Sequence, residues 1–295
     1  MNRRQFLCAP AIAGAAPQAE PGSTAPDAAT NPPGLEYFIL GNGRLLAAVQ
    51  FAAEAQAGAQ AGLVLMSPGH MNRKSGSLLW HPRAGLHWSR CSVEADGKPY
   101  WPEPGDAGIE WEPDAPAPTV RIRWKAGACE VTERLWCAGS EAVLIREVEV
   151  HNAGGAAVQA RALAALRPNP LLFDEYEVDR ARARLEARGY HQIELMAASG
   201  GKALEREIEV HFGILSADGR AGACFVLTLD HPGADWTPER IGRLRAGSAA
   251  PWRNAAWLAA GDAGLDGLFR SSVRGLRSVV AESGKMDGGL WGYNL

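Results

Sequence analysis

No stretch of this chain approaches the ~18 consecutive apolar residues that a membrane-spanning helix needs, so no membrane span is expected. A surplus of basic residues is also missing, because 30 Lys and Arg stand against 33 Asp and Glu, a formal net charge of −3. A protein that binds the polyanionic backbone of a nucleic acid normally carries a basic face. Nucleic acid is therefore not expected as a partner.

The common signatures of catalytic and cofactor sites are missing as well. The chain has no zinc-ligand spacing, no phosphate-cradling loop and no Gly-x-Ser-x-Gly elbow. Its seven histidines are scattered, and none has a second histidine four residues further on. The glycines of Gly41-Asn42-Gly43 are not followed by the helix that a nucleotide site needs. The residues therefore predict no cofactor and no metal, and none is assigned a catalytic role.

What the chain does contain is a long alternation of apolar and polar residues, clearest over residues 119–167. A period of two places the apolar side chains on one face of an extended chain. Turns rich in Gly separate the runs at residues 138–140 and 152–155. The pattern predicts an antiparallel sheet that forms half of a β-sandwich. The apolar positions of the three runs are Val120, Ile122 and Trp124, then Cys129, Val131, Leu135 and Cys137, then Leu144, Val148 and Val150.

Other strands follow from the same pattern. Two apolar runs flank Gly41-Asn42-Gly43, which predicts a hairpin, and residues 63–66 predict a short buried strand. Polar and apolar residues alternate strictly over residues 207–212, which are predicted to form a strand that pairs with residues 223–229. Residues 167–170 are predicted to break the sheet, and residues 171–200 are polar and charge-rich. Residues 241–254 are interpreted as a connecting region.

Four carboxylates lie close together in the polar stretch. Paired carboxylates can serve as acid and base in catalysis. This group lacks the apolar surroundings that would raise the pKa of one member, so we interpret it as a solvated face. Its members are Asp174, Glu175, Glu177 and Asp179.

Ten tryptophans are a notable feature of the composition. Their large rings must mostly be core, but a surplus often lies flat in sugar-binding clefts. Trp80 is a candidate for such a role, because it lies in a long polar loop over residues 67–85. A solvated loop with no ligand is an equally good interpretation.

The cysteines leave two alternatives open. If the N-terminus is removed during export, Cys91, Cys129, Cys137 and Cys224 remain and could form disulfides in an oxidising compartment. Cys129 and Cys137 lie in one predicted strand at a separation of roughly 26 Å, too far for a bridge between them. Small apolar core residues are the favoured interpretation of all four.

Near the C-terminal end the period changes from two to about three and a half. The pattern predicts a helix over residues 265–280, with Gly284 as its C-cap. Arg270, Arg274 and Arg277 fall on its outer side. The apolar stripe consists of Leu265, Leu268, Phe269, Val273, Leu276, Val279 and Val280.

The first residues contain Arg3-Arg4-Gln5-Phe6-Leu7, followed by small apolar residues and an Ala13-Gly14-Ala15 cleavage pattern. They resemble a twin-arginine export signal, which predicts a periplasmic or secreted protein. A basic disordered N-terminus is the alternative. Residues 17–34 are rich in Pro, Ala, Ser and Thr and are interpreted as a disordered linker.

The order of these parts resembles a known superfamily. The Phe38–Leu46 hairpin comes first, then the run from Leu135-Trp136 to His151-Asn152, then Leu166-Arg167-Pro168-Asn169-Pro170, then the helix and residues 287–293. Together they look like the N-terminal super-β-sandwich, linker helix and first catalytic-domain residues of six-hairpin glycosidases. That superfamily contains glucoamylase-like hydrolases and related disaccharide phosphorylases, with an α/α-barrel catalytic domain.

The resemblance implies a mainly β fold, an antiparallel super-β-sandwich followed by a C-terminal linker helix. It divides the chain into a signal at 1–16, a linker at 17–34, a sandwich at 35–233, and a linker helix with the truncated start of a barrel at 234–295. The barrel's catalytic carboxylates would lie beyond Leu295, so no catalytic residue is carried over. Trp291 and Tyr293 match positions that line the sugar subsite and, with Trp80, are the predicted substrate-binding residues; an unpaired tail is the alternative for the first two.

Two functions are consistent with these observations. The first is the N-terminal domain of a secreted glycoside hydrolase acting on gluco-oligosaccharides or polysaccharides, with carbohydrate and an α/α-barrel domain as partners. The second is a stand-alone carbohydrate-binding or interaction module without catalysis.

Overall fold

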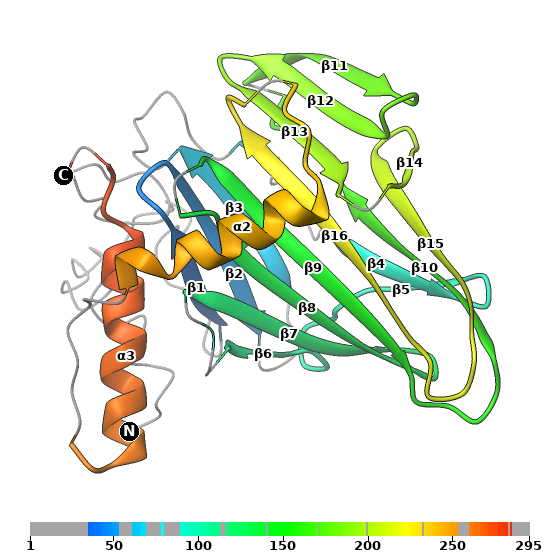
Figure 1. Cartoon of the computed structure of the whole chain (residues 1–295), viewed down its shortest axis with the longest axis horizontal. Coiled ribbons are helices and arrows are strands. Elements are labelled where there is room, and N and C mark those ends of the chain that lie inside the picture. Colours follow the sequence, from blue (N-terminus) through cyan, green and yellow to red (C-terminus); the bar gives the residue numbers. More distant parts are fainter. Residues whose placement is uncertain are drawn as a thin grey trace, which may run out of the picture.

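A computed structural model of the chain describes residues 35–52, 61–68, 78–79, 89–112, 115, 117–139, 141–170, 172–198, 200–231, 233–252, 260–282 and 284. The fold is mainly antiparallel β-structure with a helix near its C-terminal end, as predicted. Figure 1 shows two layers of strands, with one helix crossing the larger sheet and a second beside it. Among the described residues, no helix is long and apolar enough to cross a membrane.

The larger layer is a sheet of eight strands. The alternating run supplies three of them, of which β7 buries Val120, Ile122 and Trp124 and exposes Arg123 and Lys125. The confirmed period of two gives this sheet an apolar inner face and a polar outer face. In spatial order the strands are β11 (Phe173–Asp179), β12 (Arg184–Gly189), β13 (Gln192–Ala197), β16 (Arg220–Leu229), β9 (Val143–Asn152), β8 (Cys129–Cys137), β7 (Thr119–Ala126) and β6 (Gly108–Trp111).

The second layer consists of two smaller sheets. One is the predicted hairpin β1 (Leu35–Gly41) and β2 (Leu45–Ala52), extended by β3 (Gly62–Pro68). Buried side chains from all three sheets form one continuous hydrophobic core. The chain is therefore a β-sandwich whose inner faces share one core. The other small sheet has the order β14 (Lys202–Ala203), β15 (Glu207–Leu215), β10 (Val158–Ala165), β4 (Cys91–Ala95) and β5 (Lys98–Tyr100).

A buried ion pair interrupts this apolar core. Glu133 of β8 and Arg146 of β9 point inward, with 3.5 Å between Oε2 and Nε and both side chains 2% exposed. The Trp124 indole donates to Glu133 Oε1 at 2.9 Å. Burial raises the pKa of the Glu133 carboxyl, while Arg146 and the Trp124 hydrogen bond act in the opposite direction. Removing one partner of such a pair leaves the other charge buried without compensation.

Two helices follow the sandwich. α3 (Ala263–Ser278) is the predicted C-terminal helix, with Asp262 as its N-cap accepting from the Leu265 N–H. It lies against β1, the edge strand of the three-stranded sheet (Figure 1). α2 (Pro238–Ser248) occupies much of the segment interpreted as a connecting region, so that interpretation was wrong. Thr237 caps it, and Pro238 fits the first helical position because a missing N–H costs nothing there.

Two further expectations are corrected by the sheet topology. Residues 171–200 do not leave the sheet but form β11, β12 and β13, whose outward-facing charges hide the alternation. Strands β15 and β16 do not pair with each other, because β15 joins β10 and β14 while β16 joins β9 and β13. The connection between them passes from one layer to the other, which sequence periodicity cannot distinguish from a hairpin.

The four cysteines of the described residues are free thiols. Three are buried and Cys224 is half-buried, which supports their interpretation as small core residues. Cys129 and Cys137 lie at opposite ends of β8, as expected from their spacing. Burial raises the pKa of Cys137 to about 12, so its thiolate is not readily formed.

The turn between β1 and β2 joins three parts of the chain. The Asn42 side-chain amide donates to the carbonyl oxygens of Ala138 and Glu141, the latter at 2.7 Å. On its other side the Glu282 N–H donates to the Gly43 carbonyl at 2.9 Å. We call this meeting of residues 41–43, residues 138, 139 and 141, and residues 278–282 the Asn42 joint.

Candidate functional site

The predicted substrate-binding residues Trp80, Trp291 and Tyr293 lie outside the described residues. The carboxylate group is described and lies on β11 at the edge of the eight-stranded sheet. Glu177 is exposed and pairs with Arg188 at 3.2 Å, and Asp179 lies 3.7 Å from Arg184. These carboxylates face solvent and neighbouring arginines, as the sequence indicated.

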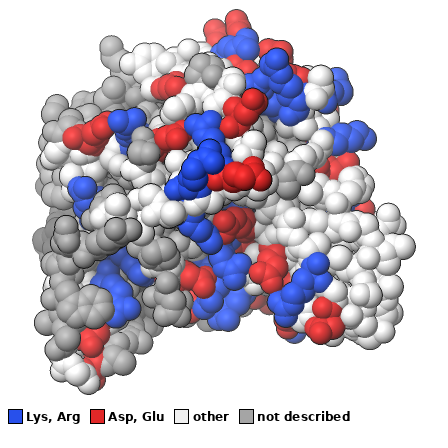
Figure 2. Space-filling view, viewed as in Figure 1, with Lys and Arg blue, Asp and Glu red and all other residues white. Residues whose placement is uncertain are grey.

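A second candidate site lies on the outer face of the eight-stranded sheet, between that sheet and α2. Trp136 of β8 and Ile145 of β9 point outward, and Trp236 and Ile241 from the α2 region cover them as a second hydrophobic cluster. Figure 1 shows α2 running across these strands. In Figure 2, basic and acidic side chains are interspersed over the same face.

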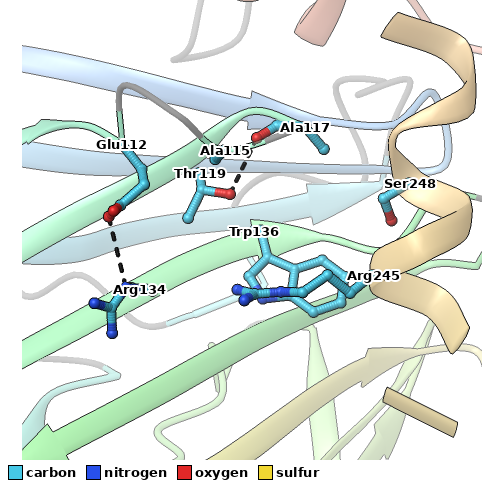
Figure 3. Close-up of a pocket in the computed structure, with 8 residues that line it drawn as sticks. All are labelled: Glu112, Ala115, Ala117, Thr119, Arg134, Trp136, Arg245 and Ser248. Atoms are coloured by element: carbon cyan, nitrogen blue, oxygen red, sulfur yellow. Dashed lines mark hydrogen bonds and ion pairs between the residues drawn. The ribbon is translucent and has the colours of Figure 1, made fainter. Parts of the chain in front are cut away.

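The site is a cavity of about 220 Å³ between α2 and strands β7 and β8. Figure 3 shows Thr119, Arg134 and Trp136 on the strand side, and Arg245 and Ser248 on the helix. Its described lining residues are Glu112, Ala115, Ala117, Thr119, Arg134, Trp136, Arg245 and Ser248.

A contact between Trp136 of β8 and Arg245 of α2 connects the strand side of the cavity to its helix side. The Arg245 guanidinium lies 5.2 Å from the centre of the Trp136 ring, within cation–π range. The same guanidinium donates to Glu147 Oε2 of β9 at 2.6 Å. These two contacts hold the last turn of α2 over the strands.

Glu112 and Arg134 form the side wall. Arg134 Nε lies 3.6 Å from Glu112 Oε2, and Arg134 Nη1 lies 3.4 Å from Glu149 Oε2. Arg121 also donates to Glu112 Oε1 at 3.1 Å. Each arginine is balanced by a carboxylate, so the wall carries no large excess charge.

The hydroxyl groups are held by the backbone. Ser248 Oγ donates to Leu244 O at 2.7 Å and accepts from Gly139 N–H at 2.8 Å. Thr119 Oγ1 donates to Ala117 O at 3.1 Å. The hydroxyl groups at the cavity are therefore fixed by backbone contacts, under a helix that is tied to the sheet.

This arrangement does not suit hydrolytic chemistry. Glu112 is the one carboxylate among the described lining residues, whereas glycoside cleavage normally uses two carboxyl groups on opposite sides of the bond. No group of three or more potential metal ligands occurs in the described part of the chain.

Sequence reasoning missed this site because it missed α2. The signals were available: Thr237-Pro238 is a helix-start dipeptide. Trp136 also breaks the alternation of β8, because an apolar residue on the outer face needs a cover. Neither signal would have placed α2 over β7 and β8 rather than beside them.

Comparison with known proteins gives a coarse result. No family model and no curated protein matches the chain. Solved structures that align with it include a bacterial glucoamylase complexed with acarbose, at 10% identity and a TM-score of 0.40 over 84% of this chain and 39% of that one. A heparan sulfate lyase mutant from Pedobacter heparinus aligns at 9% identity and a TM-score of 0.41 over 67% of this chain and 35% of that one.

A polysaccharide lyase aligns at 11% identity and a TM-score of 0.40 over 65% of this chain and 34% of that one. The chain thus spans 34% to 39% of the length of these three carbohydrate-active enzymes. Matches of this strength identify no family.

Proposed function

We propose that this chain is the non-catalytic β-sandwich part of a carbohydrate-active enzyme, of the glycoside hydrolase class, acting on gluco-oligosaccharides or polysaccharides. The observation that carries the proposal is the Asn42 joint. Three parts of the sequence resemblance meet there, namely the Gly-Asn-Gly hairpin, the β8–β9 run and the end of α3. Segments that are far apart in sequence are thus hydrogen-bonded to one another at this joint.

The joint fixes where the chain leaves α3. A Cβ on Gly43 would lie 2.8 Å from the Glu282 nitrogen, so this approach depends on glycine. Arg44 and Glu282 add an ion pair of 2.8 Å across the same contact. In the proposed function, this anchoring orients the sandwich relative to an α/α-barrel catalytic domain, whether that domain is on the same polypeptide or a separate one.

The test is an assay of the purified chain on α- and β-linked gluco-oligosaccharides and aryl glycosides. We expect rates equal to buffer, because acid and base assistance each contribute on the order of 10²–10⁴-fold and Glu112 is the one carboxylate among the described residues that line the cavity under α2. Turnover that Glu112→Gln, Asp174→Asn or Glu177→Gln abolishes would contradict the proposal, because the sandwich would then hold its own active site.

A stand-alone carbohydrate-binding module is the second candidate. The cavity under α2 favours it, because residues of this chain alone build that hollow. Adding the chain in trans to a partner barrel distinguishes the two functions. Restored barrel activity supports the first, and sugar binding without any effect on a barrel supports the second.

Export is a separate part of the proposal, and it rests on Arg3-Arg4-Gln5-Phe6-Leu7. Replacing both arginines by lysine should block translocation to the periplasm. Unchanged translocation of that variant would remove the twin-arginine assignment and leave the rest of the proposal intact.

A further inference from the structure

Tyr190 is an exposed aromatic side chain in the turn between β12 and β13, with 61% of its surface open to solvent. Every other Phe, Tyr or Trp whose side chain the structure describes is buried or half-buried. A tyrosine ring carries a large apolar surface and a polar tip, which is why tyrosines are enriched at binding surfaces. The turn is therefore a place to look for a ligand.

The fold holds Tyr190 in a fixed position. Its backbone N–H donates to the Leu172 carbonyl at 3.1 Å, and a Cβ on Gly189 would overlap that same oxygen. The ring forms a T-shaped contact with His191, with 4.9 Å between the ring centres. His191 Nδ1 in turn lies 2.9 Å from Asp230 Oδ2. A side chain that is ordered before binding loses little conformational entropy when a ligand arrives.

Tyr190 borders a polar pocket of about 410 Å³ between the start of β11 and the end of β12. Asp174 and Glu175 of β11 and Arg188 of β12 also line this pocket. All four side chains are exposed, so a ligand in the pocket can reach their polar groups. The volume falls within the range of roughly 300–1,000 Å³ that is typical of small-molecule pockets.

A β-bulge leaves Asp174 without a partner. Phe173 pairs with Gly189 and Glu175 pairs with Arg188, so Asp174 is the extra residue between two paired positions. Bulges turn a side chain out of the regular ladder and often occur beside functional sites. Within the described part of the chain, the Asp174 carboxylate has neither a hydrogen bond nor an ion pair. Its oxygens remain available as acceptors.

Arg188 supplies donors to the same pocket. Its Nε donates to Glu186, and its Nη2 donates to Glu177 at 3.2 Å. Its Nη1 lies 3.9 Å from Glu175 Oε2, which is beyond hydrogen-bond distance. Two hydrogen bonds therefore orient the guanidinium group, while the N–H groups of Nη1 remain free to donate.

The matching ligand must combine an apolar face with groups that both donate and accept. A carboxylate or phosphate would be repelled by Asp174 and Glu175. An ammonium group would suit these carboxylates but would be repelled by Arg188 and could not accept its hydrogen bond. A sugar ring meets both requirements, because its C–H groups form an apolar face and each hydroxyl can donate and accept.

We propose that this pocket is a surface site for a neutral sugar unit of an extended glycan, with the sugar ring against Tyr190 and its hydroxyls between Asp174 and Arg188. The choice of a glycan over another polyol rests on the proposed function. Figure 1 shows β11 and α3 well apart, on opposite sides of the molecule. A glycan held here lies far from the helix that leads to the proposed barrel, so the site anchors a long substrate and does not position the bond to be cleaved.

The experiment titrates the ¹⁵N-labelled full chain with maltotetraose and with cellotetraose, which are neutral glucose oligomers of α and β linkage. Two-dimensional NMR follows the backbone amide signals. We expect at least one oligomer to shift the signals of residues 172–175 and 188–191. Tyr190→Ala and Asp174→Ala should each weaken binding by about tenfold, since an aromatic contact and a charge-assisted hydrogen bond contribute on this order.

Two variants serve as matched controls. Ile214→Ala removes an exposed apolar side chain that does not line the pocket, and Asp106→Ala does the same for an exposed carboxylate. Both should bind the oligomers as tightly as the wild type. Because Tyr190 and Asp174 are exposed, their alanine variants should keep the wild-type amide spectrum outside the two segments that border the pocket.

Three outcomes overturn the surface site. The first is that neither glucose oligomer shifts the amides of residues 172–175 and 188–191. The second is that Tyr190→Ala or Asp174→Ala binds as tightly as the wild type. The third is that a charged probe, tetra-lysine or tetragalacturonate, shifts these amides at a lower concentration than both glucose oligomers.

None of these outcomes touches the proposed function, which is tested by turnover and by reactivation of a barrel. Turnover by the isolated chain would remove the proposed function whatever the amide shifts show.

Discussion

The side-chain amide of Asn42 donates a hydrogen bond of 2.7 Å to the carbonyl oxygen of Glu141, which lies 99 positions further along the chain. Its Oδ1 atom accepts from the backbone N–H groups of Arg44 and Leu45. A single side chain thus closes its own hairpin turn and ties that turn to the turn between β8 and β9. In the same region, the Gly139 N–H donates a hydrogen bond to Ser248 Oγ of α2. The motif that looked like a simple hairpin signal in the sequence therefore connects both layers to a helix.

Replacing Asn42 by Ala should lower the free energy of unfolding by about 2–6 kcal/mol. The change removes four hydrogen bonds, each with a net contribution of roughly 0.5–1.5 kcal/mol, and leaves carbonyl oxygens of a part-buried turn unpaired. Urea denaturation measures the effect. Arg44→Ala is the control, since it removes only an exposed ion pair, which contributes little to stability in water. Equal stability of the two variants would show that Asn42 does not secure the joint.

Gly41→Ala should loosen the end of α3 without unfolding the sandwich. A Cβ at this position would overlap the Ser278 carbonyl oxygen and lie 2.9 Å from its carbon. Because that contact is backbone against backbone, the end of the helix must move away. Gly108→Ala is the matched control, a strand glycine with nothing within 4 Å of the added Cβ. Faster amide exchange around residues 276–282 in Gly41→Ala alone is the expected result.

The strands were predictable where one face is apolar and the other polar. Residues 120–135 follow this rule, and the hairpin at Asn42 follows from turn chemistry. Strands β11 to β13 were hidden because their outer faces carry paired charges such as Glu177 and Arg188. Such ladders resemble a solvated loop in sequence, although Glu177 pairs with Arg188 and Asp179 with Arg184 on the next strand.

The candidate site was less predictable than the fold. It depends on α2 lying over Trp136, and that contact joins residues 136 and 245, which no local pattern relates. Sheet assignment fails for the same reason at β15 and β16, where the turn between two strands passes to another layer. Periodicity reports which face is buried, but not which element buries it.

Glu133→Gln should destabilise the chain by about 3–5 kcal/mol, because it leaves Arg146 charged and buried without its partner. Glu130→Gln, on the exposed face of the same strand, should change stability by no more than about 0.5 kcal/mol. The double variant Glu133→Leu with Arg146→Met should regain most of the loss, since a buried pair replaced by apolar residues is often neutral. A Gln variant as stable as the wild type would mean that the pair is not buried in solution.

The Glu133 carboxyl also predicts how the folding stability of the chain depends on pH. Burial raises the pKa of Glu133 above its ordinary value of 4.5, so the folded state holds this proton more tightly than the unfolded state. Folding stability should therefore fall as the pH rises from about 4.5 towards the raised folded pKa. The Gln variant lacks this group, so its own stability should show less of this fall over the same pH range. A fall of equal size in both proteins would contradict the raised pKa.

α3 should be the least protected regular element of the described chain in amide exchange. Its apolar stripe is incompletely covered, since Leu265 and Leu276 are 54% and 53% exposed and, among its described side chains, Ser278 alone is fully buried. Helices gain most of their stability from tertiary packing, so such a helix should open more readily than β8 and β9. Gly275→Ala should slow its exchange, because alanine favours the helix by roughly 1 kcal/mol and the added Cβ meets nothing within 4 Å. Protection of α3 equal to that of β8 and β9 in the wild-type chain would show instead that the helix docks fully on the sandwich and needs no further domain to cover it.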